Sequence, residues 1–500
     1  MKQAKCILDK DYIIGGIDPR LYGSFIEHMG RAIYSGIYEP CHPVADEQGF
    51  RKDVIALVKG LKIPIIRYPG GNFVSGYNWV DGIGPRENRP RRLELAWSSI
   101  ETNEIGIDEF ADWAKKVNAA VMPAVNLGTG TPKEAGHMLE YCNHPSGTYW
   151  SDLRIKNGHK QPHKFKVWCL GNEMDGSWQI CSLSADEYGR KARETAKIMK
   201  WIDSDVELVA CGSSNTELPS YPEWDRIVLE YVYEYVDYYS LHRYYEPDEE
   251  SNVADFLASF FEMENFIKTI ISTVDYVKAK NRSKKTMYLS FDEWNVWYCK
   301  QVKLEKWKIA PAISEENYSL LDALVVGGLL CTLLKNSDRI RIACLAQLVN
   351  TIAPILTEKG GTAIKQTIYY PFQQVSTYGR GELIRPILRC PLFETKKYGE
   401  VPVLQSAAVY DAEKGNVNLF VLNCDQNEDI NLSVNLRSFG DAEIIGHVVL
   451  DGPDMYAANS FKEPYKVMPR EVQVNRERGN EFTVNLPKLS WNMIRFSIVS

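Results

Sequence analysis

The sequence lacks the features of a membrane or secreted protein. No stretch approaches the roughly 20 apolar residues that a membrane-spanning helix needs. The opening ten residues carry three lysines and no long apolar core, so we expect no secretory signal. The eleven cysteines are an odd number without C-x-x-C spacing, and several lie in apolar runs, where a free thiol behaves as a small hydrophobe. We therefore expect a reducing, cytoplasmic location and no membrane partner.

Positive charge and nucleotide-binding motifs are also scarce. The formal net charge is -7 and the isoelectric point is near 5.8, whereas nucleic-acid binding needs clustered lysine and arginine. Neither a G-x-G-x-x-G motif nor a P-loop occurs, and no His, Cys and Asp cluster has the spacing of a zinc site. We therefore expect no nucleic-acid partner, no cofactor and no metal.

What is present is an ordinary globular composition. The chain has 500 residues, of which 45% are hydrophobic and 25% are charged. Such a chain has room for one large domain and a smaller companion.

From about residue 20 to residue 385, short apolar runs alternate with longer amphipathic segments. Asp108 is a candidate cap for one helix, and Ser184 with Glu187 forms a candidate capping box for another that runs to Met199. Further helices are expected over Val253–Val277 and around Asn317–Leu334. Eight strand-plus-helix units predict an α/β fold with a (β/α)₈ TIM barrel, and a doubly wound open sheet is the alternative. The expected strands are Tyr22–Ile26, Ile63–Arg67, Ala120–Asn126, Lys166–Leu170, Glu207–Cys211, Tyr238–His242, Met287–Phe291 and Ile342–Gln347.

The pattern changes near Pro386. Short alternating segments then dominate, which predicts a C-terminal antiparallel, jelly-roll-like β-sandwich. Lys5–Ile14 also alternates, so we expect it to join that sandwich. The expected division is residues 1–17 as N-terminal strands of the sandwich, 18–385 as the catalytic barrel and 386–500 as the sandwich. Its expected strands are Leu404–Tyr410, Val417–Leu422, Ile430–Leu436, Ala442–Val449, Phe482–Leu486 and Met493–Ile498.

Two carboxylate motifs follow apolar runs of strand length, Trp168–Glu173 (WCLGNE) and Leu289–Trp294 (LSFDEW). Hydrolysis of a glycosidic bond needs two carboxyl groups held on either side of one anomeric carbon, and the strand ends of a barrel supply that geometry. A lone Asn-Glu pair is more often an exposed helix surface. Here, however, other polar residues follow the remaining strands, which favours an active site; they are Glu27, Arg67, Asn72, Asn126, His242, Tyr244 and Gln347.

The two glutamates have different expected roles. Glu173 is the candidate general acid, which must be protonated near neutral pH. Glu293 is the candidate nucleophile, which must be ionised to form a covalent glycosyl-enzyme. The structural alternative for Glu293 is a buried ion pair with Arg67. That pair is compatible with catalysis, because a nearby cation keeps a carboxylate charged.

Several neighbouring side chains have open roles. Trp178, Trp97 and Trp294 are each candidates for stacking on a sugar or for packing. His242 would hydrogen-bond the nucleophile or fill polar space. Pro69–Gly71 is expected to form a turn that brings Asn72 into the cavity.

Together these motifs resemble the α-L-arabinofuranosidases of glycoside hydrolase family 51, over nearly the whole chain. Ser177 is a local departure, since many relatives have proline there. The resemblance rests on Arg67–Trp79 (RYPGGNFVSGYNW), Trp168–Gly176 (WCLGNEMDG), Leu241–Tyr245 (LHRYY), Asp292–Trp294 (DEW) and Ala346–Pro354 (AQLVNTIAP).

The resemblance implies an exo-acting, retaining, double-displacement glycosidase with Glu173 as acid/base and Glu293 as nucleophile. Its implied substrates are terminal non-reducing α-L-arabinofuranosyl residues of arabinan or arabinoxylan oligosaccharides, and its implied assembly is a homohexamer. The implied sugar-binding residues are Glu27, Asn72, Asn172, Tyr244 and Gln347, with Trp178, His242 and Arg67 as further candidates. The alternatives are another clan A retaining glycosidase, such as a β-xylosidase or endoglucanase, and a non-catalytic carbohydrate-binding protein on a decayed barrel.

Overall fold

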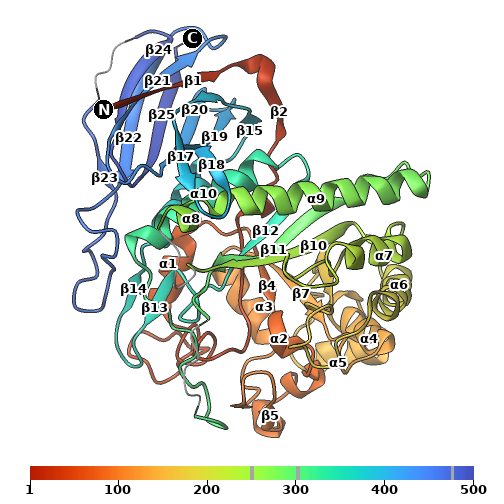
Figure 1. Ribbon diagram of the computed structural model, residues 1–500. Coiled ribbons are helices and arrows are strands. Elements are labelled where there is room, and N and C mark those ends of the chain that lie inside the picture. The colour runs from red at the N-terminus through yellow and green to blue at the C-terminus, as the bar shows by residue number, and fades with distance from the viewer. Residues whose placement is uncertain (248–252, 300–304, 475–477, 500) are drawn as a thin grey trace.

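The computed structural model describes residues 1–247, 253–299, 305–474 and 478–499. Within these residues a barrel forms one part and a β-rich assembly the other, with helices α8, α9 and α10 running between them (Figure 1). No helix in the described ranges has the length and apolar character needed to cross a bilayer.

Eight parallel strands close into the barrel in the order β10-β11-β12-β3-β4-β7-β8-β9. Every strand expected from the sequence is found, with ends shifted by a few residues. Closure of β9 against β10 confirms the TIM barrel over the open sheet. The strands are β3 Gly23–Phe25, β4 Ile65–Tyr68, β7 Ala120–Val125, β8 Val167–Leu170, β9 Glu207–Ala210, β10 Tyr238–Tyr245, β11 Tyr288–Val296 and β12 Ile340–Ala346.

The helices mostly follow the expected pattern. The Ser184–Glu187 capping box is confirmed at the start of α6. Asp108, by contrast, does not cap α3: Gly106 is the N-cap, and Asp108 is buried against Tyr141 and His163. The single helix expected over Val253–Val277 is divided into two, α8 and α9. The α-helices of the described residues are α1 Lys52–Gly60, α2 Gly71–Val74, α3 Ile107–Lys116, α4 Pro132–Asn143, α5 Tyr149–Lys156, α6 Ala185–Ile202, α7 Glu223–Val232, α8 Val253–Leu257, α9 Ser259–Lys280, α10 Leu320–Lys335 and α11 Tyr369–Tyr378. The short 3-10 turns are η1 Lys10–Tyr12, η2 Pro19–Tyr22, η3 Trp79–Gly82 and η4 Arg86–Asn88.

Helix α10 joins the two parts of the molecule. It packs against α9 and α11 on the barrel side and against β19, β20 and β25 on the other. Because it is covered on both sides, nearly all of its side chains are buried and it has no polar stripe. Gly327 on this helix lies against the ring of Trp491, where a Cβ would come within 2.5 Å of the indole.

The β-rich part contains a seven-stranded sheet, β2-β15-β19-β20-β25-β22-β23, and a four-stranded sheet, β16-β1-β21-β24. All six strands expected after Pro386 are present. Strand β15, which ends just before Pro386, also belongs to the seven-stranded sheet. Strand β1 runs parallel to β21, so one pair departs from the antiparallel pattern. The strands are β1 Lys2–Leu8, β2 Ile13–Gly16, β15 Glu382–Ile384, β16 Ile387–Arg389, β19 Leu404–Asp411, β20 Asn416–Asn423, β21 Ile430–Leu436, β22 Ala442–Leu450, β23 Arg470–Glu471, β24 Glu481–Leu486 and β25 Ser490–Ile498.

Three two-stranded hairpins complete the fold. The β17–β18 hairpin leaves the β-rich part and lies beside α8 above the barrel (Figure 1). The hairpin strands are β5 Arg92–Glu94 with β6 Ser99–Glu101, β13 Ile355–Thr357 with β14 Ala363–Lys365, and β17 Leu392–Thr395 with β18 Gly399–Pro402.

Candidate active site

A cavity of about 460 Å³ opens at the C-terminal ends of the barrel strands, where barrels of this class carry their chemistry. The structure brings most of the sequence-predicted residues to it. Arg67, Asn172 and His242 lie directly behind its wall, hydrogen-bonded to groups that line it. The predicted residues that line the cavity are Glu27, Asn72, Glu173, Trp178, Tyr244, Glu293 and Gln347.

A β-bulge on β11 shapes the site. Ser240 of β10 pairs with Ser290, but His242 pairs with Glu293, so β11 carries one extra residue over this stretch. In a regular strand, neighbouring side chains point to opposite faces. The bulge breaks that alternation and lets Asp292 and Glu293 both contact the site.

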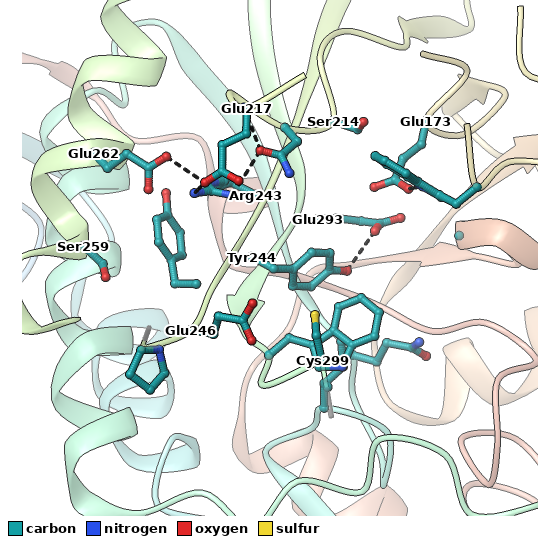
Figure 2. Close-up of a pocket in the computed structure, with 18 of the residues that line it drawn as sticks. Glu173, Ser214, Glu217, Arg243, Tyr244, Glu246, Ser259, Glu262, Glu293 and Cys299 are labelled. Atoms are coloured by element: carbon teal, nitrogen blue, oxygen red, sulfur yellow. Dashed lines mark hydrogen bonds and ion pairs between the residues drawn. The ribbon is translucent and has the colours of Figure 1, made fainter. Parts of the chain in front are cut away.

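Glu293 is held by donors on several sides. Arg67 donates from Nη1 to Oε1 at 2.5 Å, and the Tyr244 hydroxyl donates to Oε2 at 2.8 Å. His242 Nδ1 lies 3.6 Å from Oε2. The ion pair expected as a structural alternative is therefore present, and Figure 2 shows the Tyr244 contact.

The charge balance around Glu293 is set by burial and by these neighbours. Burial raises the pKa of Glu293 above its ordinary value, and the His242 and Arg67 cations and the Tyr244 hydrogen bond reduce that rise without reversing it. Burial lowers the pKa of His242, but Glu293, Asp292 and Glu173 outweigh it and raise it to about 10. His242 is therefore a second buried cation at neutral pH.

Asp292 links the two cations. Its Oδ2 lies 3.1 Å from Arg67 Nε and its Oδ1 lies 3.5 Å from His242 Nε2, and the Ser240 hydroxyl donates to it. Burial raises the pKa of Asp292, but these partners outweigh burial and leave it below the ordinary value. Asp292 thus supplies the negative charge that balances Arg67 and His242 behind the cavity.

Glu173 lies across the cavity from Glu293. His242 Nδ1 is 3.0 Å from its Oε1, and the Trp178 indole donates to Oε2 at 2.6 Å. The backbone of Glu173 has φ 43°, a left-handed conformation that is uncommon for a non-glycine residue and is enriched at functional sites. An oxygen of Glu173 and one of Glu293 lie within 4.8 Å of each other.

Asn172 offers one unused donor. Its Oδ1 accepts from Arg67 Nη2 at 2.7 Å, which fixes the orientation of the amide. Its Nδ2 is buried and has no hydrogen-bond partner among the described residues. A buried amide donor without a partner is costly, so a ligand oxygen at this point would restore a hydrogen bond.

A further carboxyl group, Glu27, lines the cavity. It accepts from the Trp97 indole at 3.2 Å and from the Phe73 amide at 3.1 Å, and Gln347 Nε2 lies 3.3 Å away. Burial and the charge of Glu293 raise the pKa of Glu27 well above its usual value. Gly71 is required here: with φ 68°, its Cβ would come within 2.3 Å of the Glu27 carboxyl carbon.

The three tryptophans divide into two roles. Trp178 is 45% exposed and binds Glu173, and Trp97 binds Glu27, so both position carboxyl groups at the cavity. Trp294 is fully buried, which confirms the packing alternative for this residue. The sequence did not predict a role for Asp292, although this residue lies inside the recognised DEW motif. It also did not predict Lys397 and Tyr398, which line the cavity from the β-rich part.

Two groups of side chains in the described ranges bring three potential metal ligands together. One is Glu173, His242 and Glu293, where His242 Nδ1 already binds Glu173 and lies 3.6 Å from Glu293. The other joins Asp108 to His159 and His163, away from the cavity. There Asp108 already binds His163 at 2.7 Å and the Tyr141 hydroxyl at 2.6 Å, so its oxygens are occupied. Metal independence stays a prediction.

Two known families match the chain, and the second match begins within barrel strand β11. Residues 57–260 match the family described as α-L-arabinofuranosidase 1 domain. Residues 292–490 match the family described as α-L-arabinofuranosidase C-terminal domain.

Similar curated proteins cover the full chain. The chain is 53% identical to the intracellular exo-α-(1→5)-L-arabinofuranosidase of Halalkalibacterium halodurans, over 98% of both chains. It is also 53% identical to the intracellular exo-α-(1→5)-L-arabinofuranosidase 1 of Bacillus subtilis, over 99% of both. A family 51 α-L-arabinofuranosidase from Bifidobacterium longum superposes with a TM-score of 0.96 at 42% identity, covering 99% of this chain and 100% of that one.

Proposed function

The chain belongs to the α-L-arabinofuranosidases of glycoside hydrolase family 51, and we propose that Glu293 and Glu173 perform its hydrolysis as nucleophile and acid/base. The observation that carries this assignment is the asymmetry between the two carboxylates. Glu293 receives a guanidinium and a phenol hydrogen bond, which favour its ionised form, whereas Glu173 receives a hydrogen bond from the indole of Trp178, which is 45% exposed.

The spacing of the two groups supports retention of configuration. Their nearest oxygens are within 4.8 Å, close to the roughly 5–5.5 Å of retaining enzymes and short of the roughly 6.5–9.5 Å that an inverting water requires. Glu293 attacks the anomeric carbon while Glu173 protonates the departing glycosidic oxygen. Glu173 then takes a proton from water, which displaces Glu293 and releases arabinose with its original configuration. The His242 and Trp178 bonds hold the Glu173 carboxyl in one position for both steps.

The sugar ring is held by the polar groups around this pair. The Nδ2 of Asn172, which is buried without a partner among the described residues, supports a role as donor to the 2-hydroxyl, where a hydrogen bond strengthens as the oxocarbenium-like transition state forms. Glu27, with its raised pKa, can donate as well as accept. Asn72, Tyr244 and Gln347 supply the remaining polar contacts.

The names of the relatives support a proposal for the linkage. The three relatives that are 53% identical are named for α-(1→5) linkages, and one named for α-(1→6) linkages is 44% identical. We therefore propose exo-cleavage of α-(1→5)-linked arabino-oligosaccharides. Relatives named intracellular support a cytoplasmic location. A homohexamer and the division into residues 1–17, 18–385 and 386–500 are parts of the same proposal.

Two measurements test the proposal. The first compares turnover of 4-nitrophenyl α-L-arabinofuranoside with that of 4-nitrophenyl β-D-xylopyranoside. A preference for the arabinofuranoside is expected, and a preference for the xyloside would assign the site to the clan A alternative. The second follows the first-formed sugar by proton NMR. The retained anomer is expected, and the opposite anomer would remove the nucleophile role from Glu293.

A further inference from the structure

The active-site cavity extends beyond the groups that the proposed mechanism uses. In Figure 2, Glu217, Ser259 and Glu262 gather away from Glu173, with Tyr244 and Glu293 between them. The whole cavity has about 460 Å³, the size of sites that hold drug-sized ligands, which are larger than one pentose ring. Its outer part is lined by Glu217, Arg243, Tyr245, Asp255, Phe256, Ser259, Glu262, Lys397 and Tyr398.

One wall of this outer part comes from the β-rich part of the molecule. Lys397 and Tyr398 occupy the turn of the β17–β18 hairpin, more than a hundred residues from Glu293 in the sequence. The barrel helix α8 anchors that turn, because Asp255 Oδ1 accepts from the Lys396 amide at 2.7 Å. The Tyr398 ring also packs near Phe261 of α9, with centroids 5.9 Å apart. The hairpin is therefore fixed to the rim of the cavity from both sides.

The opposite wall carries a hydrogen-bond network centred on Arg243. Arg243 donates to Glu262 at 2.9 Å, to the Asn215 amide oxygen at 3.1 Å and to Glu217 at 3.2 Å. Each carboxylate keeps further acceptor positions beyond its bond to Arg243. Tyr245, which is 3% exposed, also lines the cavity, and its hydroxyl has no hydrogen-bond partner among the described residues.

These walls suit a particular ligand chemistry. Sugars present hydroxyls along their edges, for carboxylates and hydroxyls to bind, and C–H faces that pack on aromatic rings. The outer cavity offers both, with carboxylates beside Arg243 and the rings of Phe256 and Tyr398. A neutral, hydroxyl-rich ligand fits better than an anion, because Glu217, Glu262 and Asp255 outnumber Arg243 and Lys397.

We propose that the outer cavity binds the second and third sugar residues of an arabino-oligosaccharide, and that the β17–β18 hairpin forms one wall of this subsite through Tyr398 and Lys397. The proposal rests on the proposed function, since it places the scissile bond between Glu173 and Glu293. It assigns the β-rich part a direct role in choosing the substrate.

The test compares two substrates in one set of variants. Tyr398→Ala is expected to lower kcat/KM for α-(1→5)-arabinotriose roughly tenfold more than for 4-nitrophenyl α-L-arabinofuranoside, because only the trisaccharide reaches the hairpin. Lys397→Ala is expected to show the same bias at roughly threefold. Lys396→Ala is the matched control: it is the same residue type one position earlier, its side chain is exposed and does not line the cavity, and no change is expected.

The outcomes separate the two proposals. If Tyr398→Ala and Lys397→Ala change both substrates equally, or change neither, the subsite proposal is overturned while the proposed function stands. If the unaltered enzyme turns over neither substrate, the proposed function fails. A crystal structure of Glu173→Ala with arabinotriose provides the second measurement, in which a sugar is expected within about 4 Å of the Tyr398 ring. A trisaccharide bound away from the hairpin would refute the proposal even if Tyr398→Ala proved unstable.

Discussion

The inner and outer ends of the cavity are built differently. At the inner end, Glu27 and Gln347 follow barrel strands and Glu293 lies within β11. All three are at most 3% exposed and are held by neighbouring polar groups. At the outer end, Arg243 pairs with the exposed Glu217, and Lys397 comes from a hairpin of the other part of the molecule. The inner end is rigid because every group is over-determined by its partners, which suits bond cleavage. The outer end suits selection among substrates, because its groups can change without disturbing the chemistry.

The same contrast applies to two arginine–carboxylate pairs. Arg67 and Asp292 are each 1% exposed, so removing one charge leaves the other without solvent to replace it. Glu217 is 68% exposed beside Arg243, so water screens that pair. Substitutions at the two ends should therefore differ in size as well as in kind.

The largest effect is expected at the inner end from Glu293→Ala, which should lower kcat by more than about 10⁴-fold on every substrate, because no covalent intermediate forms. Added azide should restore turnover and give the glycosyl azide of inverted configuration, detected by NMR. Glu413→Ala, an exposed glutamate of the β-rich part, serves as the control. A folded Glu293→Ala protein that azide does not rescue would contradict the nucleophile role.

Glu173→Ala should have the next largest effect, and its size should depend on the leaving group. A loss of roughly 10²–10⁴-fold is expected on arabino-oligosaccharides, whose leaving oxygen needs a proton, and a much smaller loss on dinitrophenyl arabinofuranoside. Steady-state rates across a series of aryl arabinofuranosides measure this. Equal losses on all leaving groups would argue against the acid role.

Asp292→Asn tests whether the buried charge behind the cavity is structural as well as catalytic. Loss of this carboxylate leaves Arg67 and His242 under-compensated, so we expect the free energy of unfolding to fall by on the order of 3 kcal/mol. Chemical denaturation measures that change. We also expect kcat to fall on all substrates, since Arg67 positions Glu293. A stable variant with wild-type kcat would show that Asp292 is dispensable.

His242 predicts a pH dependence of stability. Its pKa rises from 6.5 to about 10 on folding, so its protonated form stabilises the fold. That contribution is complete below about pH 6.5, declines as the pH rises, and is lost above about pH 10. The stability difference between the wild type and His242→Gln should shrink over this window in denaturation experiments. His447→Gln is the control: burial lowers the pKa of His447 below 6.5, so its contribution changes only below this window and its stability difference should stay constant within it. A difference that is constant across the window would mean that His242 is neutral.

The smallest effect is expected at the outer end from Glu217→Gln. Its exposed pair with Arg243 should contribute no more than about 1 kcal/mol to stability, so denaturation should barely change. The KM for arabinotriose should rise by no more than roughly threefold while kcat stays constant. A loss as large as that of Asp292→Asn would erase the contrast between the two ends.

The inner end was predictable from the sequence because its signals are local. The barrel strands are buried, so they appear as apolar runs, and Glu27, Asn72, Glu173 and Gln347 follow directly after such runs. Asp292 was missed because regular alternation would turn it away from Glu293, and the bulge that brings both to the site has no signal in the residues around it.

The outer end was not predictable because its contacts are long-range. Tyr398 lies in a short hairpin whose sequence carries no motif, and only the packing of that hairpin on α8 brings it to the cavity. Asp108 shows the same limit within one helix. Its type and position fit an N-cap, but hydrogen bonds to Tyr141 and His163 bury it instead.

The pairing of β1 with β21 has a consequence for synthesis on the ribosome. Lys2–Leu8 leaves the ribosome early, but its parallel partner Ile430–Leu436 follows some four hundred residues later. At roughly 5–20 residues per second, β1 waits on the order of 20–90 s without that partner. The barrel strands between them emerge in the meantime, so the barrel has time to close before the β-rich part can assemble. Lys2 and Lys5 on the waiting strand are the kind of charged side chain that discourages edge pairing with the wrong chain.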